Sequence, residues 1–231
     1  MKKIITTLKA DWPRFTLDLL VVVLGITIAF TLESWAEKRK ERQVREEYVR
    51  LAYYELIDDM ALLDENIRYY QHSDSIASVY LESLLYESYK DDDSAHHTLA
   101  GLASLSLFVP SFNAYESLKS FGGMNILDNH QMVKKYNEII SYYHGEMKEQ
   151  GQILKEIVMK EWLTGPLLEN FNLSSGHFRD EEVLYSLKFF NMLTLNKGLR
   201  VNYLQMLRQY KEKSGQLLEL YHTEWPKLKD V

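Results

Sequence analysis

The sequence contains no cysteine and little proline or glycine. Without cysteine, the chain cannot form disulfides, zinc sites built on thiolates, or a catalytic thiol. Folds rich in sheet need many turns built from proline and glycine, yet the 231 residues include only 4 prolines and 10 glycines. None of these falls between residues 26 and 100. The scarcity predicts an all-α protein with long helices and few connections.

A clear excess of basic over acidic residues is confined to one short run. The net charge is −6, and residues 36–45 hold five basic and two acidic side chains, so the rest of the chain is strongly acidic. An acidic surface is a poor partner for nucleic acid, whose affinity comes mainly from neutralised phosphates. The basic run instead fits anionic lipid headgroups. We therefore expect a lipid bilayer, and no nucleic acid, among the partners.

Motifs for catalysis or cofactor binding are missing as well. The sequence has no Gly-x-Ser-x-Gly, Walker or dinucleotide-binding glycine pattern. Glu219 and His222 form one Glu-x-x-His pair, but a di-metal carboxylate site needs two such pairs. His96 and His97, which follow three aspartates, are more typical of a polar loop. We expect no enzyme activity, no metal and no cofactor.

One long uncharged run near the N-terminus carries the clearest signal. It covers residues 19–32, and extending it from Phe15 to Trp35 gives about 20 residues, enough to cross a bilayer core about 30 Å thick. Trp12 and Trp35 bracket it as interfacial aromatic residues do. The basic residues that follow at the expected interface are Lys38, Arg39 and Lys40. The pattern predicts a tail over 1–14, a transmembrane helix over 15–35 and a helical domain over 36–231.

Two other interpretations of this run stay open. A cleaved signal peptide would use the basic start at Lys2 and Lys3 and a cleavage site near Ser34-Trp35-Ala36, although the charge of Glu33 and the bulk of Trp35 disfavour it. A buried core helix would rarely have such basic flanks. The side of the membrane that holds the domain is undecided, because lysine and arginine are similarly numerous on both sides.

Association between copies is predicted from two features. Gly25 and Ala29 form a small-xxx-small pair, which lets two helices approach closely in lipid. Beyond the anchor, an apolar stripe with 4-3 spacing is expected along one helix that continues to about residue 71. The stripe suits either a coiled coil between copies or, more commonly, one helix of an intramolecular bundle. Its members are Val49, Tyr53, Leu56, Met60, Leu63, Ile67 and Tyr70.

Further helices are expected from start and stop signals. A second helix is expected to begin at Ser73-Asp74, and a short one to cover residues 95–108 before Pro110. Asn113 and Glu116 match a capping box, and Asp128 or Asn129 is expected to cap a helix to about Leu163. The final helical region is expected over 181–223, with a possible split at Asn196-Lys197-Gly198.

The sequence resembles a family of bacterial single-pass membrane proteins of unknown function. The first matching stretch is Leu24–Ala29 followed by Glu33–Lys40, where members typically read Gly-Ile-x-Ile-Ala and then Asn-Asn-Trp-Asn-Glu with a basic run. The second is residues 114–120, Ala-Tyr-Glu-Ser-Leu-Lys-Ser, followed by the Tyr142-Tyr143 pair. Glu33 and Ala36 stand where the family usually has asparagine. The resemblance implies a location in the bacterial inner membrane, and it supplies an architecture without an activity.

These observations favour a membrane-anchored helical interaction or scaffold protein. The alternatives are a single-pass sensor whose helical domain binds a small ligand, and one subunit of a membrane pore. Another membrane or envelope protein is a possible partner besides further copies of the chain. Tyr115, Glu116 and Lys119 are candidate partner contacts on one short helix, although capping and core packing explain the same residues.

Overall fold

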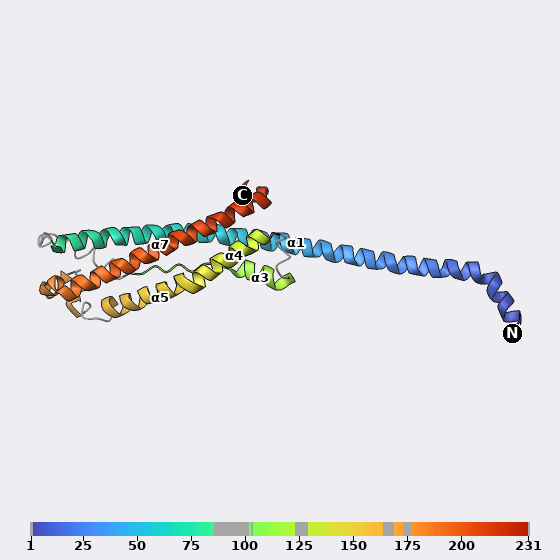
Figure 1. Ribbon diagram of the computed structural model, residues 1–231, viewed down its shortest axis with the longest axis horizontal. Coiled ribbons are helices and arrows are strands. Elements are labelled where there is room, and N and C mark those ends of the chain that lie inside the picture. The colour runs from blue at the N-terminus through green and yellow to red at the C-terminus, as the bar shows by residue number, and fades with distance from the viewer. Residues whose placement is uncertain are drawn as a thin grey trace. The chain divides into compact units, whose positions relative to one another are not determined.

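The computed structural model describes residues 2–85, 102, 104–122, 129–163, 169–172 and 177–230. Almost all of the described chain is helical, which confirms the all-α class (Figure 1). The α-helices are α1 (Lys2–Leu85), α3 (Asn113–Gly122), α4 (His130–Tyr142), α5 (Lys148–Ile157) and α7 (Leu187–Glu224). Shorter elements are the π-helices η3 (Tyr143–Met147) and η4 (Val158–Leu163), the 3-10 helices η5 (Glu181–Tyr185) and η6 (Pro226–Asp230), and the strands β1 (Phe171–Asn172) and β2 (His177–Phe178).

The chain divides into two compact units, Met1–Val49 and Arg50–Val231. The strands form one antiparallel pair in the second unit, in which Phe171 faces Phe178. We call the second unit the helical domain.

Helix α1 continues past the position at which a second helix was expected. Ser73 and Asp74 were expected to begin a new helix, and this prediction is wrong, because α1 runs unbroken to Leu85. The Ser73 hydroxyl donates to the carbonyl of Tyr69 at 3.0 Å, and the Ser78 hydroxyl donates to the carbonyl of Asp74 at 2.7 Å. These serines thus bond back to the preceding turn of the same helix rather than capping a new one.

The buried stripe of α1 in the helical domain differs from the expected one at every seventh residue. It has the same 4-3 spacing, but it includes three polar residues seven positions apart: Asp59, Asn66 and Ser73. Met60 and Ile67, chosen for their hydrophobicity, are only half-buried. The apolar members of the stripe are Ala52, Leu56, Leu63, Tyr70, Ala77 and Tyr80.

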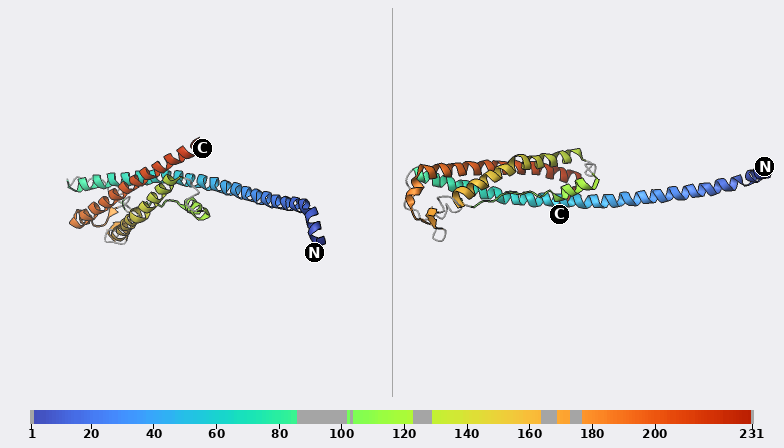
Figure 2. Two further views of the ribbon diagram at one scale, coloured as in Figure 1. Left: turned by 45° about the vertical axis from the view of Figure 1, so that its right-hand side comes forward. Right: turned by 90° about the horizontal axis from the view of Figure 1, so that it is seen from below.

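Residues 130–163 form the continuous helical stretch that was predicted. Asn129 caps it, since its side-chain oxygen accepts from the backbone N–H groups of Gln131 at 2.9 Å and Met132 at 3.2 Å. The stretch includes two π-helical turns, η3 and η4, and packs along α7 (Figure 2). The expected inward positions Met132, Tyr136 and Met147 are buried.

The last long helix, α7, starts later than predicted and is not split. Residues 181–185 form the separate 3-10 turn η5, and the Ser186 hydroxyl then accepts from the N–H of Phe189 at 3.2 Å to cap α7. The expected break at Asn196-Lys197-Gly198 is absent. Asn196 is instead buried within the helix, where its side-chain oxygen accepts a hydrogen bond from Arg200 Nε at 2.6 Å.

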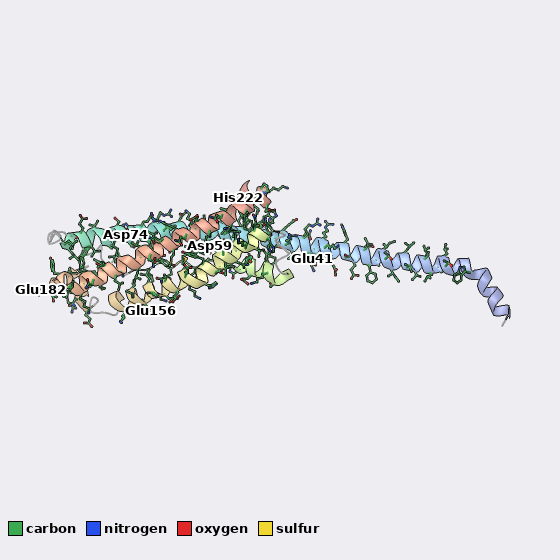
Figure 3. The ribbon with its side chains drawn as sticks, in the orientation of Figure 1. Glu41, Asp59, Asp74, Glu156, Glu182 and His222 are labelled. Carbon is green, nitrogen blue, oxygen red and sulfur yellow. The ribbon has the colours of Figure 1, made fainter. Side chains whose placement is uncertain are left out.

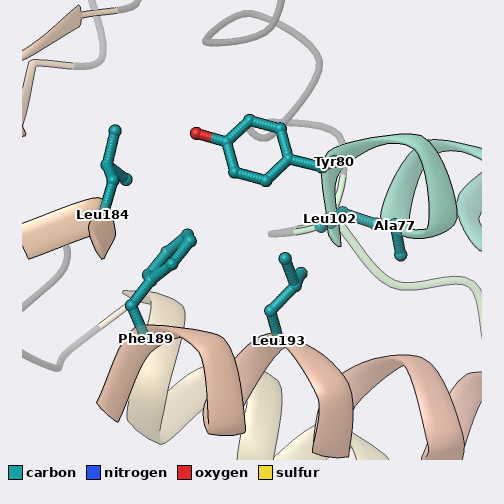
Figure 4. Close-up of a cluster of buried hydrophobic side chains, with 6 residues drawn as sticks. All are labelled: Ala77, Tyr80, Leu102, Leu184, Phe189 and Leu193. Carbon is teal, nitrogen blue, oxygen red and sulfur yellow. The ribbon is translucent and has the colours of Figure 1, made fainter. Parts of the chain in front are cut away.

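One end of the helical domain is closed by a cluster of apolar side chains (Figure 4). Tyr80 of α1 lies near Phe189 of α7, with ring centroids 6.2 Å apart in an edge-to-face arrangement. The cluster consists of Ala77, Tyr80, Leu102, Leu184, Phe189 and Leu193. The cluster brings together α1, η5 and α7, of which α1 is far from the other two in sequence. Their packing therefore depends on burial of these side chains and not on local sequence patterns.

Candidate functional site

The first candidate site is the apolar stretch of α1 that begins at Thr16. It is long and apolar enough to cross a membrane, and none of its most apolar 18-residue window is buried. Its large side chains between Leu19 and Leu32 are 51–67% exposed. A core helix would be covered by the rest of the chain, so this alternative does not fit. A signal sequence passes the same test.

The polar groups inside this stretch are satisfied within the helix. The hydroxyl of Thr27 donates to the carbonyl of Val23 at 2.8 Å, and the hydroxyl of Thr31 donates to the carbonyl of Ile28 at 3.1 Å. In a hydrocarbon environment, an unsatisfied hydroxyl would be costly. The stretch is therefore compatible with lipid on all sides, and it offers few groups that would line an aqueous pore.

The predicted contact and interface residues of this helix are all exposed. At Gly25, an added Cβ atom would meet nothing within 4 Å, so the face with Ala29 is open to another helix. Trp12 and Trp35 are 68% and 60% exposed. The Arg39 guanidinium lies over the Trp35 ring, 5.5 Å from its centroid.

The second candidate site surrounds an irregular segment, residues 104–112, which we call the strap. A helix was expected over 95–108. Leu102 is helical and residues 104–108 are not, while residues 95–101 and 103 lie outside the described chain. Buried backbone groups outside a helix need other partners, and side chains of α1 and α7 supply them. Tyr70 donates to the carbonyl of Ser106 at 2.7 Å, and the N–H of Phe108 donates to Tyr203 at 3.2 Å.

Arg200 holds the start of the strap from α7. It is the largest fully buried side chain, and its Nη2 donates to the carbonyls of Leu102 at 2.6 Å and Ser104 at 2.8 Å. Its Nη1 reaches the hydroxyls of Tyr69 and Ser73, both at 3.4 Å. Its guanidinium carbon also lies over the Tyr70 ring, 6.0 Å from the centroid. Among the described residues, no carboxylate lies at ion-pair distance of Arg200, so the groups of the described chain that bind this buried cation are neutral.

Two carboxylates one turn apart on α1 hold the other end of the strap and the start of α3. The N–H of Ser111 donates to both oxygens of Asp59, at 3.2 and 3.0 Å, and the N–H of Ala114 donates to Glu55 Oε2 at 3.0 Å. Negative groups at a helix N-terminus also interact favourably with its dipole. The capping box that was predicted within α3 is therefore wrong in detail. The N–H of Glu116 donates to the carbonyl of Phe112, and the cap comes from α1.

Asp59 is the chemically unusual member of this pair (Figure 3). It is only 7% exposed, and no cation of the described chain pairs with it. The pKa of its carboxyl group is raised to about 7. Burial is the main cause; the hydrogen bond from Ser111 lowers the pKa, and the nearby charges of Glu55 and Asp58 raise it. Asp59 can therefore gain or lose a proton near neutral pH.

The space beside Asp59 is too small for a substrate. The cavity has a volume of about 10 Å³, which is room for one water molecule. Its walls include Glu55, Phe112, Tyr136, Tyr210 and Leu217. Burial and the charge of Asp59 raise the pKa of Tyr210 far above its usual range, so this phenol stays neutral. The arrangement can bind a proton, but it cannot bind a small organic ligand.

The three predicted partner contacts do not share one exposed surface. Tyr115 is only 4% exposed and stacks on Tyr136, with ring centroids 4.1 Å apart, so the prediction that it contacts a partner is wrong. Glu116 and Lys119 are exposed, and Leu118 is buried as expected for the core face. Residues Glu116 and Lys119 alone remain accessible.

Of the histidines weighed as metal ligands and set aside, His222 lies within the described residues. His222 lies on α7 near its C-terminal end, and its Nε2 is 3.2 Å from the hydroxyl of Tyr53 (Figure 3). Within the described residues, no three histidine, aspartate or glutamate side chains are placed to bind a metal ion. His96 and His97, together with their neighbouring aspartates, lie outside the described chain.

Sequence reasoning missed Asp59 and Arg200. The available signal for Asp59 was its position, because it lies three residues after Leu56 and four before Leu63, on the buried stripe of α1. Arg200 lies seven residues after Leu193 and seven before Leu207, so it is on the same buried face of α7 as these leucines. A charged residue in phase with a buried stripe would have marked both.

Comparison with known proteins adds no relative: no protein-family model, no curated protein and no solved structure matches this chain.

Proposed function

We propose that this chain is a single-pass protein of the bacterial inner membrane whose helical domain is an interaction or scaffold module. One observation carries the proposal, the uncovered apolar stretch of α1 that begins at Thr16. Burying one leucine, valine or phenylalanine side chain is worth about 1.5–3 kcal/mol. Exposing such side chains to water along several consecutive turns of α1 would be strongly unfavourable. A lipid bilayer would cover all faces of this stretch.

The way the helical domain is held together supports the interaction role in this proposal. In the core of the helical domain, the side chains of Arg200, Tyr70 and the two carboxylates of α1 form hydrogen bonds to backbone groups of distant segments. A rigid helical body joined to an anchor suits the presentation of a surface to another protein. Further copies of the chain are the first partner we propose.

Pairing of copies would use the anchor in this proposal. The α1 stripe expected to pair is covered within the chain, since Tyr70 contacts Tyr203 of α7 at a centroid distance of 5.2 Å and Leu56 lies beside Leu217 at the small cavity. Gly25 and Ala29 remain open. Close approach at such small residues is a common mode of helix association in lipid.

A direct test is extraction of the full-length protein from its native membrane. We expect the protein to stay in the pellet after washes with high salt and at alkaline pH, at its full mass. Recovery in the supernatant at a mass reduced by about 36 residues would identify a cleaved signal peptide and contradict the anchor.

A sensor is the second candidate, and Asp59 favours it. A buried carboxyl group whose pKa is about 7 responds to physiological changes in pH. The ligand of such a sensor would be the proton, because the cavity beside Asp59 holds no more than a water molecule. The pH dependence of an Asp59→Asn variant, developed in the Discussion, tests this candidate.

A further inference from the structure

The charges just beyond the apolar stretch of α1 are sorted onto two faces of the helix. Successive residues of an α-helix are rotated by about 100°. Trp35, Lys38, Arg39 and Arg42 follow one another at intervals of three, one and three residues, so they share one face. Their side chains are exposed. We call these four residues the basic stripe.

The opposite side of the same turns is acidic. Glu33, Glu37 and Glu41 are spaced by four residues and form a line along the helix, and Lys40 lies next to this line. Figure 3 labels Glu41 on this exposed part of α1. If these basic residues only determined membrane topology, they could lie on any face of the helix, because the positive-inside rule counts lysine and arginine regardless of face. The separation of the charges onto two faces is therefore not explained by topology.

The basic stripe also points toward the apolar stretch. Side chains of a helix lean toward its N-terminus, which here is the direction of the apolar stretch. Arg39 shows this directly, because its guanidinium lies over the ring of Trp35, four residues earlier, at 5.5 Å from the centroid. The Arg39 side chain is exposed, so an acceptor outside the protein can reach its guanidinium group.

The dimensions fit a phospholipid headgroup. Seven residues separate Trp35 from Arg42, which is about 10 Å along the helix. The headgroup region on one side of a bilayer is about 5–8 Å deep. With their side chains turned back, Lys38, Arg39 and Arg42 therefore reach the level of the lipid phosphates when Trp35 lies at the edge of the hydrocarbon.

We infer that the basic stripe is a binding site for the headgroup of an anionic phospholipid, with Lys38, Arg39 and Arg42 on its charges and Trp35 against its glycerol backbone. This inference rests on the proposed membrane anchor. The acidic line on the other face repels the same headgroups, so binding is confined to one side of the helix. Zwitterionic lipids lack the net charge that the three cations neutralise.

The test uses full-length protein reconstituted in phosphatidylcholine vesicles that contain a trace of spin-labelled lipid. Electron paramagnetic resonance gives the fraction of labelled lipid held at the protein, for phosphatidylglycerol and for phosphatidylcholine. We expect wild type to prefer phosphatidylglycerol by about threefold or more. The preference should fall toward one at 1 M salt, where the screening length is about 3 Å.

Two single substitutions provide a matched pair. Lys38→Gln and Lys40→Gln remove the same charge from the same residue type two positions apart, one on the basic stripe and one beside the acidic line. We expect Lys38→Gln to lose at least half of the preference, because one basic residue near an anionic surface changes affinity by up to about fivefold. Lys40→Gln should keep it, and the combined Lys38→Gln, Arg39→Gln and Arg42→Gln variant should abolish it.

Three results would overturn the inference, and one of them identifies failure of the anchor itself. No preference in wild type, or equal losses in Lys38→Gln and Lys40→Gln, would mean that no one-sided lipid site exists even though the protein stays in the vesicles. Release of wild type from pure phosphatidylcholine vesicles by an alkaline wash would show instead that the anchor fails, and the lipid site with it.

Discussion

Replacing Asp59 with asparagine tests the unusual carboxyl group in the core of the helical domain. Asp59 is 7% exposed, and its pKa is raised from 3.8 to about 7, chiefly by burial. One pKa unit corresponds to about 1.4 kcal/mol. Ionising Asp59 in the folded chain therefore costs up to about 4 kcal/mol more than ionising it in the unfolded chain.

The sign of the pH dependence follows from the raised pKa. Between pH 3.8 and about 7, the folded chain keeps the proton on Asp59 and the unfolded chain has lost it. The free energy of unfolding contributed by Asp59 thus falls by about 1.4 kcal/mol for each pH unit as the pH rises, and it levels off above pH 7. The full stabilisation from Asp59, relative to its ionised state, is present only below pH 3.8, where Asp59 is protonated in both the folded and the unfolded chain.

Asparagine removes this dependence while keeping an acceptor for the N–H of Ser111. At pH 8, Asp59→Asn removes the cost of burying a charge. Burying the new amide NH2 group without a partner costs about 1–3 kcal/mol and offsets part of this gain. A net gain of about 2 kcal/mol remains, which raises the Tm by about 4–8 °C for a domain of this size. At pH 5, where Asp59 is neutral, the variant should be no more stable than wild type.

Thermal unfolding of the full-length protein in detergent, followed by circular dichroism from pH 5 to 8.5, measures the effect. Asp58→Asn is the matched control, since it removes the same charge from an exposed neighbour, and it should change stability by less than about 0.5 kcal/mol at every pH. Equal destabilisation by Asp59→Asn at pH 5 and pH 8 would refute the reasoning. Asp59 would then be charged throughout, and its bond to Ser111 would outweigh its burial.

Three further experiments test the packing and the anchor. Leu118→Asp should destabilise the helical domain by several kcal/mol, because it buries a carboxylate, whereas Lys119→Ala on the exposed face should cost less than about 0.5 kcal/mol; the reverse order in thermal unfolding would contradict the assigned faces. Arg200→Leu should cost about 3 kcal/mol or more, since it removes the donors to the buried carbonyl of Leu102 and to the buried side-chain oxygen of Asn196, while Arg208→Leu on the exposed side of α7 should be nearly neutral, and similar Tm values for both variants would count against the strap. Gly25→Ile should reduce cross-linking of copies in membranes by blocking close approach; undiminished cross-linking would exclude this face as the interface.

The local features of this protein were predictable from its sequence. Scarce proline and glycine predicted the all-α class, and an uncharged run predicted a helix that could span a membrane. A cap was expected at Asp128 or Asn129, and Asn129 is the residue that caps α4. Each of these depends on residues within a few turns of one another, so periodicity and capping chemistry suffice to identify them.

The order of helices and loops was harder to predict where backbone groups find distant partners. Ser73 reads as a helix start, yet α1 continues through it because the serine hydroxyl bonds to the preceding turn. The strap reads as a helix before Pro110, yet it is held in an irregular form by Tyr70, Tyr203 and Arg200. These partners lie 36 to 98 positions away in the sequence, so no local pattern reveals them.

The polar residues of the core depend on partners that the tertiary structure supplies. By hydrophobicity, Met60 and Ile67 belong in the stripe of α1, but Asp59 and Asn66 take the buried positions. The transfer of a carboxyl group out of water is unfavourable by itself, and only the N–H of Ser111, brought to Asp59 by the fold, makes it tolerable. Hydrophobic periodicity therefore predicted the helices and most of the buried positions of α1, and hydrogen bonds to residues distant in sequence explain why Asp59 and Arg200 are buried with them.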